Sequence, residues 1–110
     1  MKLGEQYLKE TAQTESNGER PTEYYALGLA GETGELVDLI KKELFHGKAP
    51  DRVGVLLEAG DVLWYLIRTL RRYGWTLEEA LAANIQKLAK RYPDGYSHAA
   101  SAARVDAVKP

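Results

Sequence analysis

The chain is expected to fold as an all-α protein, a four-helix bundle. Three observations predict this fold class. Apolar residues recur at helical spacing in four segments, no segment shows the sustained period of two that is typical of a strand, and glycine or proline separates the segments. At 110 residues the chain is long enough for one modest core. We expect residues 1–97 to form the helical domain and residues 98–110 to form a C-terminal tail or arm.

The first two helices are predicted over residues 2–14 and 22–45. Ser16-Asn17-Gly18 interrupts the apolar pattern between them. Pro21 is typical of a helix start, and Gly47 ends the second helix. A short loop then leads to the second half of the chain.

The third helix is expected to begin after Asp51 as its N-cap and to run to about residue 73, with Gly74 at the position that favours a left-handed backbone. The fourth helix is expected to open at the capping box Thr76-x-x-Glu79 and to stop before Pro93. The tail beyond it is rich in alanine and serine and can add a short helix.

Composition excludes several classes of function. The formal net charge of -1 provides no field that would recruit nucleic acid, and no apolar run approaches the roughly 20 residues that span a membrane. There is no cysteine, which excludes thiolate metal sites and cysteine nucleophiles and fits the cytoplasm. The N-terminus turns polar at once and is not expected to be a signal peptide. We therefore expect a cytoplasmic protein with neither nucleic acid nor membrane as a partner.

Two pairs of acidic residues carry the strongest functional signal. Glu32 and Glu35 stand three positions apart, as do Glu58 and Asp61, and each pair lies in a predicted helix. Residues three apart share a helix face, so two such helices side by side bring four carboxylates together. Crowded like charges repel one another unless a cation neutralises them, and oxygen ligands suit Mg²⁺ or Mn²⁺. The sequence therefore predicts a divalent-metal site.

A solvated helix face is the commoner explanation for a single pair of this kind. The surroundings favour the metal site instead, because residues 53–67 are apolar nearly all round apart from Glu58 and Asp61, which predicts a largely buried helix. Three glycines at intervals of three in the second helix are expected to allow the close approach of a neighbouring helix: Gly28, Gly31 and Gly34.

A second group of polar residues lies on the fourth helix. Asn84, Lys87 and Arg91 fall on one face, and Lys41 and Lys42 lie near the end of the acidic helix. An amide and several cations beside a metal suit a polyanion such as a nucleoside triphosphate. The alternative for Lys87 and Arg91 is a basic last turn that complements the helix dipole.

Other chemistries find little support in the sequence. There is no serine–histidine–acid grouping, phosphate-binding loop or zinc motif, and the pair of Glu-x-x-His motifs that di-iron bundles use is absent, since His46 alone has a glutamate, Glu43, three residues before it. Trp64 and Tyr65 are expected in the core, although the Tyr65 hydroxyl can also reach the site because it follows Asp61 by one turn.

The ordered set of motifs resembles the MazG-like nucleoside triphosphate pyrophosphohydrolases. The resemblance rests on residues 26–36 and 57–66, which hold the two acidic pairs, and on Asn84-x-x-Lys87 followed by residues 90–96. It covers roughly residues 22 to 97. Ala59 stands where many relatives have leucine, a departure that leaves the acids untouched.

The resemblance implies an all-α fold and Mg²⁺-dependent hydrolysis of nucleoside triphosphates to a monophosphate and pyrophosphate, with nucleotide-pool house-cleaning as the expected role. It implies four metal ligands: Glu32, Glu35, Glu58 and Asp61. Glu35 or Glu58 is expected to act as the catalytic base. The expected substrate contacts are Asn84, Lys87, Arg91, Lys41 and Lys42. Mn²⁺ can substitute for Mg²⁺, and a homodimer or homotetramer is expected, joined through the helices.

Two alternatives stay open on the sequence. One is a hydrolase of narrow, dUTPase-like specificity, since base choice depends on the shape of a pocket. The other is a helical regulatory module that binds nucleotide or metal without turnover. Intact acids in both motifs favour the enzyme.

Overall fold

The computed structural model describes residues 2–15 and 18–106, and its regular elements are all helices. The all-α prediction is confirmed: the described residues contain four substantial helices and no β-strand. The chain divides into two compact units, residues 1–76 and residues 77–110, which are considered in turn. Among the described residues, no helix combines the length and the apolar character that crossing a bilayer requires.

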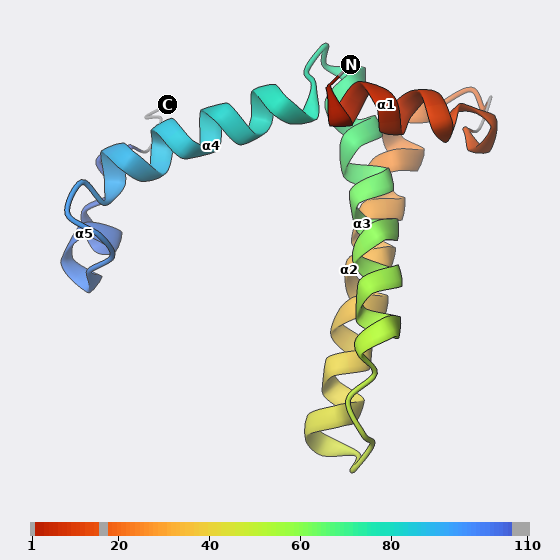
Figure 1. Cartoon of the computed structure of the whole chain (residues 1–110), viewed down its shortest axis with the longest axis horizontal. Helices are drawn as coiled ribbons and strands as arrows, with labels where there is room; N and C mark the ends of the chain where they lie inside the picture. The colour runs from red at the N-terminus through yellow and green to blue at the C-terminus, as the bar shows by residue number, and fades with distance from the viewer. Residues whose placement is uncertain (1, 16–17, 107–110) are drawn as a thin grey trace. The chain divides into compact units, whose positions relative to one another are not determined.

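A long helical hairpin forms the body of the first unit. Helices α2 (Pro21–Phe45) and α3 (Arg52–Arg72) run side by side along their length (Figure 1). Both predicted ends of α3 are confirmed, since the Asp51 carboxylate accepts a hydrogen bond of 2.8 Å from the Gly54 amide, and Gly74 has a φ of +79° just beyond the end of the helix. The hairpin therefore places the two acidic motifs on neighbouring helices.

A glycine of α2 faces an aromatic ring of α3 in this hairpin. A methyl group added at Gly28 of α2 would overlap the ring of Tyr65 on α3. The expected use of glycine is therefore confirmed at Gly28, whereas a methyl group at Gly31 or Gly34 would meet nothing within 4 Å. The contact between Gly28 and Tyr65 sets the register of the hairpin close to the acidic residues.

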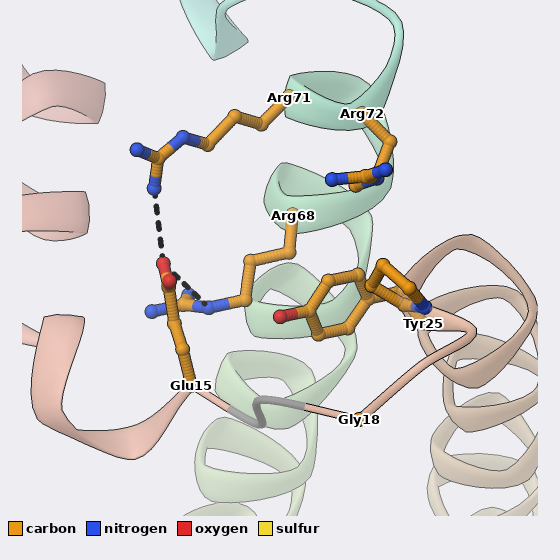
Figure 2. Close-up of a pocket in the computed structure, with 7 residues that line it drawn as sticks. Glu15, Gly18, Tyr25, Arg68, Arg71 and Arg72 are labelled. Atoms are coloured by element: carbon orange, nitrogen blue, oxygen red, sulfur yellow. Dashed lines mark hydrogen bonds and ion pairs between the residues drawn. The ribbon is translucent and has the colours of Figure 1, made fainter.

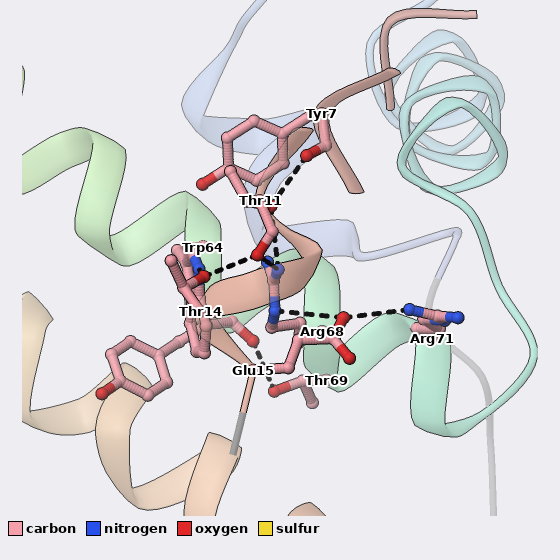
Figure 3. A network of polar contacts seen from close by, with 9 residues as sticks. Tyr7, Thr11, Thr14, Glu15, Trp64, Arg68, Thr69 and Arg71 are labelled. Carbon is pink, nitrogen blue, oxygen red and sulfur yellow. Dashed lines mark hydrogen bonds and ion pairs between the residues drawn. The ribbon is translucent and has the colours of Figure 1, made fainter. Parts of the chain in front are cut away.

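The first predicted helix divides into two parts. Helix α1 (Leu3–Glu10) is followed by a short 3₁₀ helix, η1 (Ala12–Thr14), and the break falls at Thr11. The reason is visible in Figure 3: the Thr11 hydroxyl donates to the Tyr7 carbonyl at 2.7 Å, and Arg68 of α3 donates to both the hydroxyl and the carbonyl of Thr11. A further hydrogen bond, from the Trp64 indole to the Thr14 hydroxyl at 2.9 Å, holds η1 on α3.

Few large apolar side chains are buried within the single chain. Among the described residues, Tyr25 and Ile67 are the large apolar side chains that are fully buried, and they lie near the end of the hairpin that η1 covers. The prediction that residues 53–67 form a largely buried helix is wrong for the chain taken alone, since Leu56 is 71% exposed and Val53 and Leu57 are also exposed. The first unit taken alone therefore leaves much of the apolar surface of α3 exposed.

The second unit consists of helix α4 (Leu77–Arg91) and a folded tail. Helix α4 ends before Pro93 as predicted, and a short helix, α5 (His98–Ala103), follows with Ser97 as its N-cap. Arg104 ends α5 with a left-handed φ of 50°. The chain then brings the carboxylate of Asp106 against the guanidinium of Arg91, so the described part of the tail is attached to the end of α4.

Candidate functional site

Three of the four predicted acidic ligands converge between α2 and α3. Glu32 from α2 and Glu58 and Asp61 from α3 each offer one carboxylate oxygen, and these oxygens all lie within 4.8 Å of one another. The helical spacing of Glu58 and Asp61 directs both to the face that α2 covers. The hairpin therefore builds a cluster of negative charge from Glu32 and two acids of α3 that follow it by 26 and 29 positions in the sequence.

The electrostatics of the cluster are unfavourable without a counter-ion. Partial burial raises the pKa of Glu32, and so do its hydrogen bond with Glu58 and the charges of Asp61, Glu58 and Glu35. One oxygen of Glu58, Oε2, is buried and has no hydrogen-bond partner among the described residues. In the described part of the chain, no cation forms an ion pair with any of these carboxylates.

This donor set fits a hard divalent cation. Carboxylate oxygens are the ligands that Mg²⁺ and Mn²⁺ prefer, and a buried oxygen without a partner is satisfied by coordination. Glu32, Glu58 and Asp61 would hold the ion. Its binding would also relieve the repulsion that raises the pKa of Glu32.

Glu35 lies outside this group of three. Its side chain is exposed one turn beyond Glu32, and it acts on the cluster through its charge, which contributes to the raised pKa of Glu32. Its assignment as a ligand or as the base stays a prediction. An exposed carboxylate beside the cluster is more available for proton transfer than a carboxylate that would bind the metal ion.

An aromatic pocket adjoins the acidic cluster. Its volume is about 350 Å³, and it is lined by Thr14, Tyr24, Glu32, Asp61, Trp64 and Tyr65. The rings of Trp64 and Tyr65 meet edge to face with centroids 4.8 Å apart. A hydrogen bond with Tyr24 raises the pKa of Tyr65, with smaller contributions from burial and from the charges of Glu32 and Asp61. The prediction that Tyr65 can reach the site is consistent with these interactions.

Sequence reasoning missed Tyr24 and Thr14 as neighbours of the site. Tyr24 lies eight residues before Glu32 on α2, which is just over two turns and close to the same face. That spacing was a signal available in the sequence. Thr14 carried no such signal, because the fold of η1 onto Trp64 brings it there.

Lys41 and Lys42 are both paired within α2. The Lys42 ammonium lies 2.8 Å from one carboxylate oxygen of Asp38, and the Lys41 ammonium lies 3.4 Å from the other. The hydrogen bond with Asp38 raises the pKa of Lys42. Both lysines therefore already have an anionic partner, and their role toward phosphate stays a prediction.

The three substrate residues predicted on α4 belong to the second unit. Asn84 and Lys87 are exposed on α4. Arg91 donates two hydrogen bonds to Asp106, of which the bond from Nη2 measures 2.7 Å, and the Lys87 ammonium lies 3.8 Å from the same carboxylate. Arg91 lowers the pKa of Asp106 to about 2. Contact of these residues with a nucleotide stays a prediction.

One comparison with known proteins identifies a family. The model of the MazG nucleotide pyrophosphohydrolase domain matches residues 20–96, which is well over half of the chain and includes both acidic motifs and Asn84-x-x-Lys87. No curated protein and no solved structure gives a significant match.

Proposed function

We propose that this chain, which belongs to the MazG nucleotide pyrophosphohydrolase family, hydrolyses nucleoside or deoxynucleoside triphosphates to a monophosphate and pyrophosphate with the help of Mg²⁺. Family membership implies the reaction type. The dependence on Mg²⁺, with Mn²⁺ as a substitute, and a house-cleaning role in the nucleotide pool are part of the proposal.

The observation that carries the proposal is the convergence of Glu32, Glu58 and Asp61 within 4.8 Å, together with the buried, unpartnered Oε2 of Glu58. A surface face of acids would spread its charges and solvate each of them. In this cluster the three charges converge and one oxygen of Glu58 is buried without a partner among the described residues, which is the arrangement expected where a cation and the phosphates it binds complete the site.

In this reaction the protein need not form a covalent intermediate with the substrate, and it acts by positioning and by electrostatic stabilisation. When bound, Mg²⁺ would neutralise phosphate charge and make a nearby water more acidic. Glu35, which is exposed beside the cluster, accepts the proton from the attacking water in our proposal. The bond between the α and β phosphates breaks, and Lys87 offsets the charge that develops on the departing pyrophosphate.

The aromatic pocket supplies a place for the base. Tyr24, Trp64 and Tyr65 offer ring surfaces next to the acidic cluster, and stacking on aromatic rings binds any base without selecting its edges. The polar groups of the wall outside the cluster are already engaged: the Thr14 hydroxyl accepts from Trp64, and the hydroxyls of Tyr24 and Tyr65 hydrogen-bond to each other. We therefore expect activity on several triphosphates rather than on dUTP alone.

Self-association is part of the same proposal. The exposed Leu56, Leu57 and Val53 of α3 and the exposed Leu27 of α2 form more apolar surface than a helical hairpin normally leaves open. A homodimer or homotetramer joined through these helices would cover it. Light scattering at micromolar protein checks this, and a mass near 12.3 kDa would contradict it.

The deciding experiment is release of pyrophosphate from a panel of eight common nucleoside and deoxynucleoside triphosphates in the presence of Mg²⁺, with EDTA as the control. We expect pyrophosphate and monophosphate in equal amounts and no release in EDTA. Release from dUTP alone would indicate narrow specificity. Binding of triphosphates without pyrophosphate release would indicate a regulatory module.

A further inference from the structure

A second cavity of the first unit lies outside the acidic cluster. Its volume is about 400 Å³, and it is lined by the start of α2 and the last turns of α3 together with Glu15 and Gly18 (Figure 2). The residues that matter for its chemistry are Glu15, Pro21, Tyr25, Arg68, Arg71 and Arg72. Neither the family match nor the proposed reaction assigns it a role.

Positive charge dominates the wall of this cavity. Three guanidinium groups face one carboxylate, that of Glu15, which leaves two positive charges in excess. The Glu15 carboxylate accepts a hydrogen bond of 3.0 Å from Arg71, and the same oxygen lies 3.5 Å from Nε of Arg68. Arg72 donates from its Nε to the Thr22 hydroxyl at 3.2 Å. Glu15 therefore neutralises only part of the charge.

Arg68 is the buried member of the group. Its side chain is 1% exposed, its guanidinium stacks 3.9 Å from the centre of the Trp64 ring, and Nη2 donates to Thr11. Its Nη1 and Nε donate no hydrogen bond to any described residue. A buried charged group with unused donors costs stability unless something accepts from it. Nε lies 3.5 Å from the Glu15 carboxylate and Nη1 has no partner among the described residues, so a ligand that displaces Glu15 can accept hydrogen bonds from this guanidinium.

The N-terminus of α2 adds positive electrostatic potential to the same cavity. Pro21 occupies the first turn of this 25-residue helix, and Arg20 at the N-cap provides no side-chain cap. Helix N-termini attract anions because their amide groups and the helix dipole present partial positive charge. Pro21 lines the cavity, so the positive end of α2 and the three arginines act on one volume.

We propose that this cavity binds a phosphoryl group, as a phosphate monoester or a short polyphosphate. Two excess positive charges match the charge of about -1.5 to -2 that a phosphate monoester carries at neutral pH, and guanidinium forks match its oxygens. The volume exceeds that of a phosphate alone, and the Tyr25 ring in the wall offers a surface for an organic part. A carboxylate ligand would balance only one of the two charges.

The phosphoryl group can come from either of two sources. Arg68 follows Asp61 by seven residues, which is about 10 Å along α3, and Trp64 stands between them. The phosphates of a triphosphate held at the acidic cluster would have to pass Trp64 to reach the arginines. A separate phosphorylated ligand would occupy the cavity independently.

The test is calorimetric titration of the whole, metal-free protein in EDTA with inorganic phosphate and with pyrophosphate. We expect saturable binding that is at least about tenfold weaker in the Arg71→Gln/Arg72→Gln variant, because charge-assisted hydrogen bonds are lost. The matched control, Lys48→Gln/Arg52→Gln, removes two exposed cations from the other end of the hairpin and should bind as the parent does. Glu15→Gln should bind more tightly, because it removes the competing carboxylate.

Equal affinity in the two double variants, or no binding by Glu15→Gln, would overturn the proposal. Because the titration contains no metal and needs no turnover, its result does not depend on the proposed hydrolysis. A second titration identifies the source: a triphosphate with Mg²⁺ is added to protein saturated with phosphate. Competition assigns the cavity to the phosphates of the triphosphate, whereas independent binding assigns it to a separate ligand.

Discussion

The acidic cluster on α2 and α3 and the basic turn at the end of α4 differ in how their charge is neutralised. Glu32, Glu58 and Asp61 converge without a cation among the described residues, and one oxygen of Glu58 has no partner. Lys87 and Arg91 instead share a carboxylate of their own unit, Asp106.

The acidic cluster needs a bound cation to neutralise it, whereas the basic turn is already neutralised by a carboxylate of the same chain, Asp106. The cluster gains stability from any divalent cation, since nothing within the described chain neutralises it. The basic turn is already compensated, so a phosphate must replace Asp106 before Arg91 can bind it with both nitrogens.

The largest effect is expected for Glu58→Gln. It removes the charge of the carboxylate that contributes the buried, unpartnered oxygen, so turnover should fall about 100- to 1,000-fold, a loss of about 3–4 kcal/mol of transition-state stabilisation. Steady-state pyrophosphate release at saturating Mg²⁺ measures it. Glu43→Gln, an acid of the same helix as Glu32 but outside the cluster, is the control and should retain parental activity. Equal activity of both variants would mean that the cluster is not the metal site.

A smaller loss is expected for Lys87→Ala. Its ammonium offers no lone pair to a metal, so its partner in our proposal is a phosphate oxygen. We expect kcat/KM to fall by about 2 kcal/mol, or about 30-fold, mostly through kcat. Mn²⁺ affinity measured without nucleotide should stay within a few-fold of the parent. Normal hydrolysis by this variant would make Lys87 a surface charge that complements the end of α4.

The third prediction concerns stability against pH in EDTA. The pKa of Glu32 lies above its ordinary 4.5, so the folded state binds the proton more tightly than the unfolded state does. The contribution of Glu32 to the free energy of unfolding is therefore fully present below pH 4.5 and should be lost as the pH rises through the raised pKa of Glu32. Mg²⁺ should restore it at neutral pH, by about 2.7 kcal/mol at a hundredfold excess over Kd.

Thermal melts between pH 4 and pH 8 measure this dependence, with and without Mg²⁺. Glu32→Gln should abolish this pH-dependent loss, and the Glu32→Gln/Glu58→Gln variant should respond little to Mg²⁺. An equal rise in melting temperature with Mg²⁺ in the parent and the double variant would show that the ion binds elsewhere.

The smallest effect is expected for Asp106→Asn. The variant removes the carboxylate charge that Lys87 and Arg91 share, so the KM for triphosphates should fall about two- to fivefold with little change in kcat, because both cations become more available to phosphate. Asp94→Asn, which removes an exposed carboxylate shortly after α4, is the control. An unchanged KM in Asp106→Asn would show that the basic turn takes no part in binding the nucleotide.

The helices and their caps were accessible from local sequence. Asp51, Gly74 and Pro93 mark boundaries through interactions within a few residues, and the structure confirms each of them. The spacing of Glu58 and Asp61 likewise required only the geometry of one helix. Interactions within a few residues depend little on the rest of the fold, which is why a sequence pattern can predict them.

Contacts between distant segments were decided by the tertiary structure alone. The fit of Tyr65 against Gly28 sets the register that brings Glu32, rather than Glu35, to Glu58 and Asp61. No spacing in the sequence relates Arg68 to Thr11 and Glu15, or Arg91 to Asp106. Each of these pairs depends on how one element is rotated and offset against another, and packing sets both. The sequence by itself determined the helices, their ends and the types of residue available to form a site.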